Sequence, residues 1–240
     1  MSWLPFYKKG GLMRQYKNLQ YGDETIIRAS LNALADKKTD VQNYRDAFRL
    51  LGIELGKVLA SEYKSISADQ TMLVCASEDA DWLAYGVETG FGLGELKKSV
   101  YWSSREIVHI NDDGSKIEIS PIEKAYEEMI NDCQLLIIVK SIINTSCVVK
   151  TQLTRLIGRV SPHRIAIVAP VMYRDGVPNL IQEFPEEINS KFHFITFAID
   201  DECVDSEVIP GVGGMVYSRL GLGNMEEKNH YIPEMVLSKL

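Results

Sequence analysis

Apolar residues recur at spacings of three and four between Ile26 and Tyr63, which is the period of an amphipathic helix. The polar stretch from Asp36 to Asp40 interrupts this pattern. Thr39 or Asp40 can cap a helix that begins there, because a side-chain oxygen at that position accepts from an otherwise unpaired backbone N–H. The pattern therefore predicts two consecutive helices between residues 26 and 63.

After Tyr63 the pattern changes to short apolar runs that alternate with helical stretches. The five apolar residues Leu135–Val139 are typical of a parallel strand buried on both faces, which places them at the centre of a sheet. The other expected strands are Thr71–Ala76, Lys98–Ser103, Arg164–Ala169 and Phe192–Ile199. The expected helices are Trp82–Phe91, Pro121–Asn131, Val148–Arg159 and Val177–Phe184. This order predicts an α/β fold with a doubly wound, mostly parallel sheet that follows the N-terminal helices.

Two further short runs, Ile107–Ile110 and Lys116–Ile119, flank a polar stretch that ends in Asp113-Gly114. An Asp-Gly pair supplies the positive φ angles that a tight turn between two strands requires. These residues therefore predict a β-hairpin flap.

Composition excludes several classes of protein. The apolar fraction of 45% and the charged fraction of 25% are ordinary for a globular domain, which argues against disordered, collagen-like and coiled-coil chains. The net charge of −7 argues against a general attraction to nucleic acid or to an anionic membrane. No run of 18 apolar residues is present, so we expect a cytoplasmic protein with no membrane association. The four cysteines form no C-x-x-C pair and the four histidines are scattered, so no metal site is expected.

Residues 1–24 are aromatic and basic without a clear period, and we interpret them as an N-terminal arm before a single domain at 25–240. Aromatic side chains at such density suit an interface with a protein partner through residues 1–21. The alternative is that the arm packs on its own domain. The aromatic residues of the arm are Trp3, Phe6, Tyr7, Tyr16 and Tyr21.

Three features together resemble the uracil phosphoribosyltransferases over residues 19–225. The first is Leu34-Ala35-Asp36-Lys37-Lys38-Thr39, followed by Tyr44-Arg45 and then by 51–62. The second is Phe197-Ala198-Ile199-Asp200-Asp201-Glu202, which leads to Val208-Ile209-Pro210-Gly211-Val212-Gly213. The third is the order of the elements between them, including the loop 140–147. The resemblance implies a type I phosphoribosyltransferase fold and assembly as a homodimer or larger.

The resemblance also implies that loop 140–147 binds the phosphates of phosphoribosyl pyrophosphate. In the family this loop carries an acid for the ribose hydroxyls and then Thr-Gly-Gly, whose backbone N–H groups bind the 5′-phosphate. Here Lys140 replaces the acid, and Ser146 and Cys147 replace both glycines. The acidic run Glu78–Asp81 stands where the family has an arginine for pyrophosphate, and we expect it to repel that group. The remaining candidates for phosphate binding are Arg105, Lys140, Ser141, Asn144, Thr145 and Ser146.

At the other end of the expected site, the resemblance assigns base binding to the backbone of five residues. They are Ile209, Pro210, Gly211, Val212 and Gly213. Backbone recognition of a flat ring could persist there, or the Pro-Gly pair could persist only because the turn needs it. Asp200 and Asp201 follow a strand and are the candidate catalytic acids of an active protein, which would use Mg²⁺.

Two functional hypotheses follow. The favoured one is a non-catalytic binding or assembly subunit that holds a nucleotide or phosphoribosyl ligand, because Lys140, the lost glycines and Glu78–Asp81 all depart from what the reaction needs. The alternative is an active phosphoribosyltransferase or nucleotide-processing enzyme of altered specificity, acting in nucleotide salvage or as an effector in stress or phage defence.

Overall fold

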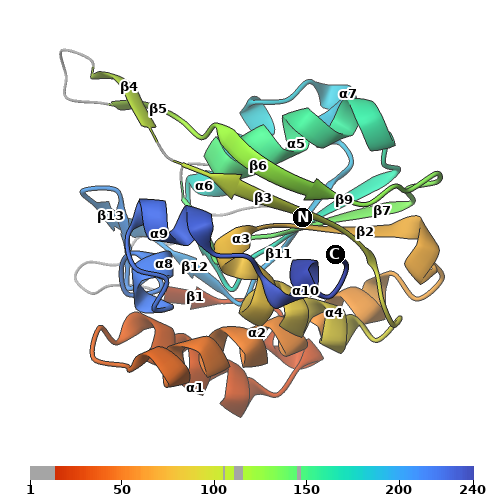
Figure 1. Ribbon diagram of the computed structural model, residues 1–240. Coiled ribbons are helices and arrows are strands. Elements are labelled where there is room, and N and C mark those ends of the chain that lie inside the picture. The colour runs from red at the N-terminus through yellow and green to blue at the C-terminus, as the bar shows by residue number, and fades with distance from the viewer. Residues whose placement is uncertain (1–13, 105, 111–115, 145–146) are drawn as a thin grey trace.

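In the computed structural model of the chain, a six-stranded sheet lies between layers of helices (Figure 1). The structure describes residues 14–104, 106–110, 116–144 and 147–240. The strands of this sheet are β2 (Thr71–Ala76), β3 (Lys97–Ser103), β6 (Ile122–Glu127), β7 (Leu135–Val139), β9 (Arg164–Val168) and β11 (Phe192–Ile195). Their order is β11-β9-β7-β2-β3-β6, and all neighbours are parallel except β6, which is antiparallel to β3. The expected doubly wound, mostly parallel sheet is confirmed.

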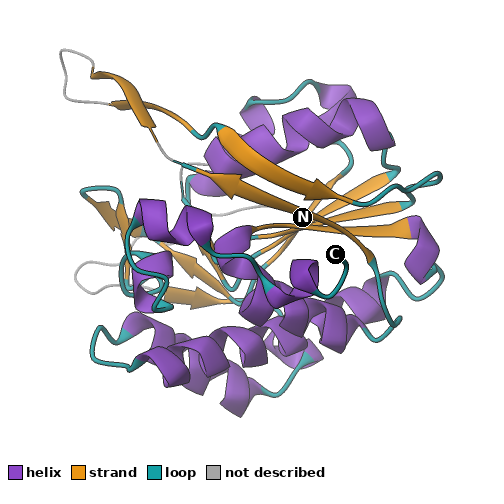
Figure 2. Ribbon diagram, viewed as in Figure 1, coloured by secondary structure: helices purple, strands orange, loops and turns teal. Residues whose placement is uncertain are grey.

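Helices cover both faces of the sheet (Figure 2). One layer contains α1 (Glu24–Ala35), α2 (Val41–Glu62) and α4 (Tyr85–Phe91), and the other contains α5 (Cys147–Val160), α6 (Gly176–Gln182) and α7 (Glu186–Asn189). The remaining helical elements are η1 (Leu19–Tyr21), η2 (Ala68–Gln70), α3 (Ser77–Asp79), η3 (Ala80–Ala84), α8 (Val216–Arg219), α9 (Met225–His230) and α10 (Glu234–Leu237). No helix in the described part of the chain is long and apolar enough to cross a membrane.

Strand β7 is buried on both faces, as its sequence predicts. Ile137 and Val139 belong to the hydrophobic core that includes the buried residues of α1 and α2, whereas Leu136 and Ile138 belong to the core that includes those of α5. Alternate side chains of a strand point to opposite faces, so five consecutive apolar residues supply both cores at once.

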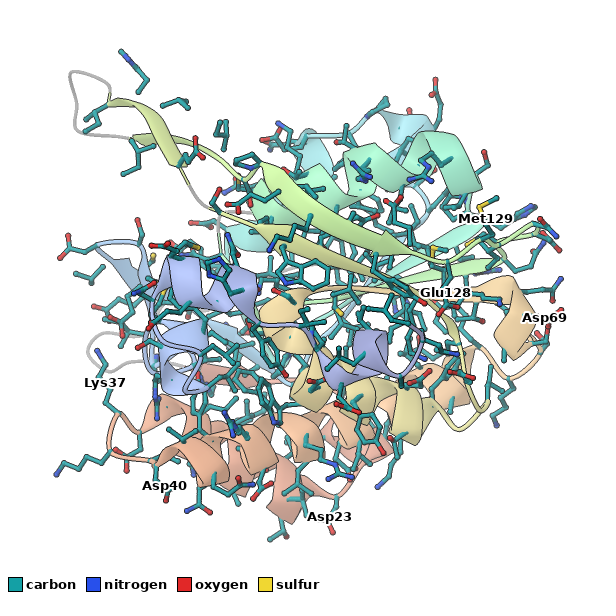
Figure 3. The ribbon with its side chains drawn as sticks, in the orientation of Figure 1. Asp23, Lys37, Asp40, Asp69, Glu128 and Met129 are labelled. Carbon is teal, nitrogen blue, oxygen red and sulfur yellow. The ribbon has the colours of Figure 1, made fainter. Side chains whose placement is uncertain are left out.

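Aspartates begin the two N-terminal helices. The Asp23 carboxylate accepts from the N–H groups of Thr25 and Ile26 at the start of α1, and that of Asp40 accepts from Asn43 N at the start of α2. Both capping residues lie along the lower rim of the molecule in Figure 3. The two expected helices are confirmed, and Asp40 is the cap of the second.

Three smaller sheets complete the fold. One contains β1 (Arg14–Tyr16), β12 (Ala198–Asp200), β10 (Val171–Tyr173) and β8 (Ile142–Ile143), in that order. The other two are hairpins, β4 (Glu106–Ile110) with β5 (Lys116–Ile119) and β13 (Glu202–Val204) with β14 (Glu207–Ile209). The expected hairpin is therefore confirmed, and β4–β5 projects from the upper left of the molecule (Figure 1).

The described part of the expected arm packs on its own chain. Strand β1 pairs antiparallel with β12, and Lys17 N donates to Phe197 O over 2.9 Å. Residues 1–13 of the arm lie outside the described residues. The division into an arm at 1–24 and a domain at 25–240 stays a prediction.

Two secondary-structure predictions are wrong. The helix expected at Pro121–Asn131 is strand β6, because Val100 pairs with Tyr126 and Trp102 with Lys124 at the edge of the main sheet. The single strand expected at Phe192–Ile199 is divided between two sheets, β11 in one and β12 in the other. Thr196 lies at the crossing point, where its hydroxyl contacts Pro170 O over 3.2 Å.

Glycines bring α2 and α4 into backbone contact. A Cβ added at any of them would lie between 2.0 and 2.4 Å from a carbonyl oxygen of the facing segment. Such distances leave no room for a side chain, so the two helices pack as closely as their backbones allow. The glycines are Gly52 and Gly56 of α2 and Gly86 and Gly90 of α4.

We expect Gly90→Ala to lower the free energy of unfolding by about 1–3 kcal/mol, because the added methyl overpacks the contact between the helices. Its Cβ would lie 2.0 Å from Ile53 O. Gly158→Ala is the matched control, since Gly158 is exposed on α5 and has no atom within 4 Å of an added Cβ. That change is expected to stabilise the helix by up to about 1 kcal/mol. Urea unfolding of both variants measures the difference, and equal effects would contradict the packing argument.

Candidate functional site

A cavity of about 510 Å³ lies at the carboxyl ends of the sheet strands. Its wall includes residues that follow β3 and β7, the start of α5, the turn between β13 and β14, and parts of α8 and α9. Ligands of doubly wound α/β proteins bind at this edge, outside the carboxyl ends of the strands. The cavity is therefore the candidate binding site.

Lys140, at the end of β7, forms an ion pair inside the protein. Its Nζ lies 2.5 Å from Asp79 Oδ2 and 3.5 Å from Glu78 Oε1, and it contacts Ser141 Oγ over 3.0 Å. Asp79 Oδ1 accepts from Ser141 N over 3.2 Å. Lys140 is 8% exposed and Asp79 is 2% exposed, so the pair is shielded from water. The Lys140 ammonium is therefore paired with the Asp79 carboxylate of the same chain.

Lys228 of α9 forms a second buried pair on the same wall. Its Nζ lies 3.6 Å from Glu78 Oε2 and donates to Ser103 O over 2.5 Å, and the side chain is 2% exposed. Burial raises the pKa of Asp79, and the charge of Lys140 opposes that rise. At Glu78 the charges of Lys140 and Lys228 outweigh burial and lower the pKa. These two ammonium groups and two carboxylates are called the cavity floor, and their charges cancel.

Asp81 holds the C-terminal segment. Its Oδ2 accepts from Glu234 N over 2.8 Å and from the Tyr231 hydroxyl, and its Oδ1 accepts from Met235 N over 3.2 Å. The Tyr231 ring stacks on Trp82 at 6.1 Å between centroids. Glu78, Asp79 and Asp81 each have a basic or N–H partner within the protein. The expectation that the run Glu78–Asp81 repels pyrophosphate stays a prediction.

The structure brings together part of the predicted phosphate site. Lys140, Ser141 and Asn144 line the cavity. Asn144 Nδ2 donates to Ser206 O over 2.8 Å, which joins the loop after β8 to the turn between β13 and β14. Arg105, Thr145 and Ser146 lie outside the described residues. Helix α5 begins directly after that gap, and Cys147 and Val148 line the cavity.

Of the five predicted base-binding residues, Val212 lines the cavity and the other four do not. The peptide bond between Ile209 and Pro210 is cis. The backbone groups of this segment form hydrogen bonds with side chains of the same protein. Gly211 N donates to Asp200 Oδ2. Val212 O accepts from Tyr44, and Gly213 O accepts from Arg219. The wall is instead formed by Val208 and by residues 214–217.

Asp200 is completely buried and does not line the cavity. Arg14 binds both of its oxygens, through Nε at 2.8 Å and Nη2 at 2.7 Å, and Gly211 N donates to Oδ2 over 2.8 Å. These contacts make Asp200 a positioning residue for the cis-proline segment. Asp201 does not line the cavity either, and its Oδ1 is buried without a hydrogen-bond partner among the described residues. The catalytic role expected of the two aspartates stays a prediction.

The chain shows its clearest likeness at the level of fold. It matches the structure of the AQ2163 protein from Aquifex aeolicus with a TM-score of 0.65 and 14% identity, over 81% of this chain and 93% of that one. The two proteins share a fold. Hypoxanthine-guanine phosphoribosyltransferase from L. donovani matches with a TM-score of 0.41 and 11% identity, over 67% and 81% of the two chains. A hypothetical protein from Neisseria gonorrhoeae, solved with bound ppGpp, matches with a TM-score of 0.38 and 10% identity, over 67% and 88%. No protein-family model and no curated sequence matches the chain.

Sequence reasoning missed one wall of the cavity. Lys228 and Met225 come from α9, a polar helix near the end of the chain, and Ser103, Ser104 and Ser120 border the β4–β5 hairpin. Nothing in their local sequence distinguishes them from ordinary surface residues. A buried lysine is unusual unless it is paired, so the position of Lys228 becomes informative only with Glu78 beside it.

Proposed function

We propose that this chain is a phosphoribosyltransferase-like protein that binds a nucleobase-containing ligand in the cavity without transferring a phosphoribosyl group. The sequence resemblance and the position of the cavity at the strand ends support the ligand class. The observation that carries the proposal is the 2.5 Å ion pair between Lys140 and Asp79. We propose further that the base of this ligand is uracil, as the resemblance implies.

Phosphoribosyl transfer requires excess positive charge for the departing pyrophosphate. The cavity floor offers none, since Lys140 and Lys228 are balanced by Asp79 and Glu78. Where the resemblance implies an acid that accepts from the ribose hydroxyls, Lys140 supplies no acceptor, and its ammonium is paired with Asp79. The floor therefore supports binding without this chemistry.

Protein assembly is the second part of this proposal. An N-terminal arm that engages a partner through residues 1–21, and association as a homodimer, would make the chain a subunit of a larger assembly. Light scattering of the purified protein measures the state of association, and a monomeric mass would contradict the homodimer.

Turnover is measured by incubating the purified protein with Mg²⁺, phosphoribosyl pyrophosphate and each nucleobase, and assaying the released pyrophosphate. We expect no release above that of a reaction without protein. Sustained release that Asp201→Asn abolishes in a folded protein would establish the alternative, an active transferase. Asp201 suits this test because Asp200 is tied into the fold by Arg14.

A further inference from the structure

We propose that the cavity is a site for an uncharged nucleoside, and that the charge of Asp79 lowers the affinity of the cavity for nucleotides and pyrophosphate. This inference rests on the proposed function, because it takes the same cavity as the binding site. It concerns the charge of the ligand, which the fold does not fix.

The first support is the charge around the cavity. The ammonium groups of Lys140 and Lys228 lie against Asp79 and Glu78, so the floor is neutral. Asp205 and Glu207 add carboxylates to the wall, and Glu207 has a partner in Lys37 at 2.8 Å. A phosphate entering this cavity meets no uncompensated lysine among the described residues and faces additional negative charge.

The second support is the chemistry of the rest of the wall. Hydroxyl groups both donate and accept, which suits the hydroxyls of a ribose, and apolar side chains suit the faces of a base. The volume of about 510 Å³ lies within the range of small-molecule sites. The hydroxyl residues are Ser103, Ser104, Ser120, Ser141, Ser206 and Tyr217. The apolar residues are Ile142, Ile143, Val148, Val149, Val208, Val212, Met215, Val216 and Met225.

Asp79 controls the charge of this wall without forming part of it. Both of its oxygens are used within the protein, one by Lys140 Nζ and the other by Ser141 N, and its side chain does not line the cavity. Asp79→Asn therefore leaves the lining residues unchanged and gives the floor one net positive charge. Lys140, which does line the cavity, then shares the carboxylate of Glu78 with Lys228, so an anion in the cavity faces a floor of net positive charge.

Calorimetry tests the inference with adenosine, guanosine, cytidine and uridine, their 5′-monophosphates, and pyrophosphate as probes. We expect the wild-type protein to bind one nucleoside at least about tenfold more tightly than its monophosphate, because one unit charge in a weakly screened site is sufficient for such a factor. Asp79→Asn should gain about tenfold or more for that monophosphate and for pyrophosphate. Adding Lys140→Met to Asp79→Asn should remove the gain.

Glu54→Gln is the matched control, since Glu54 is a buried, lysine-paired acid that does not line the cavity. It should bind every probe as the wild-type protein does. If Asp79→Asn does not fold, Glu78→Gln takes its place, because it raises the charge of the floor by the same unit, although it also changes one residue of the lining.

Three results would overturn the inference: a wild-type protein that prefers the monophosphate, a wild-type protein that binds no nucleoside of the panel, or a folded Asp79→Asn protein with unchanged affinity for anions. Pyrophosphate released from phosphoribosyl pyrophosphate by the wild-type protein is a separate readout. It would contradict the proposed absence of catalysis without deciding which ligand charge the cavity prefers.

Discussion

Lys140→Met is expected to lower the free energy of unfolding by about 3–5 kcal/mol, the cost of leaving a buried charge without its partner. The change removes the ammonium that lies 2.5 Å from Asp79 Oδ2 and 3.5 Å from Glu78 Oε1. Asp79 is 2% exposed and does not line the cavity, so water cannot replace its lost partner, whereas Glu78 keeps Lys228. Urea unfolding followed by tryptophan fluorescence measures the loss.

Two further variants distinguish the stability cost of breaking a buried ion pair from the cost of removing any lysine charge. Lys150→Met removes a lysine whose pair with Glu183 is exposed, and it should cost less than about 1 kcal/mol. The double variant Asp79→Asn with Lys140→Met should recover most of the stability, because it removes both charges and leaves the pair of Glu78 and Lys228 intact. A Lys140→Met protein as stable as Lys150→Met would contradict the buried pair.

The pair also joins two observations that are separate in the sequence. Lys140 and Asp79 lie 61 positions apart, and nothing in the sequence connects an ammonium after β7 with a carboxylate after β2. In the structure the two groups are in contact, so each balances the buried charge of the other. Their signs are therefore interpreted together, as one neutral pair.

The sequence predicted most of the elements whose signal is local. Leu135–Val139 is apolar at every position, and Asp40 precedes the periodic pattern of α2, so both identify their elements without knowledge of the neighbours. Strand β6 could not be recognised in this way. Its residues suit either a helix or an edge strand, and its pairing with β3 decides the outcome.

The site was predicted less completely than the fold, for the same reason. Loop 140–144 was located because it follows the central strand, but the roles of its residues depend on Glu78, Asp79 and Lys228, which come from distant segments. Of the segment 209–213, Val212 lines the cavity, and the base-binding role of the segment stays a prediction. However, the sequence does not reveal that Asp200, Tyr44 and Arg219 occupy its backbone groups.

The Asp200→Asn variant is expected to lose about 3–5 kcal/mol of stability. Asp200 is fully buried, and its charge balances Arg14, whose side chain is 8% exposed. Asparagine has one carbonyl oxygen in place of two charged acceptors, so Arg14 keeps its charge without a counter-charge. Arg14 Nη2 also donates to Gly211 O over 2.7 Å, so the loss should loosen both β1 and the cis-proline segment. Urea unfolding measures the stability, and amide hydrogen exchange at residues 209–213 measures the local effect.

Glu24→Gln is the control for the Asp200→Asn variant, because Glu24 accepts from Arg28 Nε over 2.7 Å in an exposed pair on α1. The two pairs have similar distances and differ in burial, so Glu24→Gln should cost less than about 1 kcal/mol. Equal losses would contradict the positioning role of Asp200. The comparison also decides how activity data are to be interpreted. A variant that unfolds residues 209–213 would abolish any turnover whether or not its carboxylate reacts. A residue outside that network, such as Asp201, is therefore needed to report on catalysis.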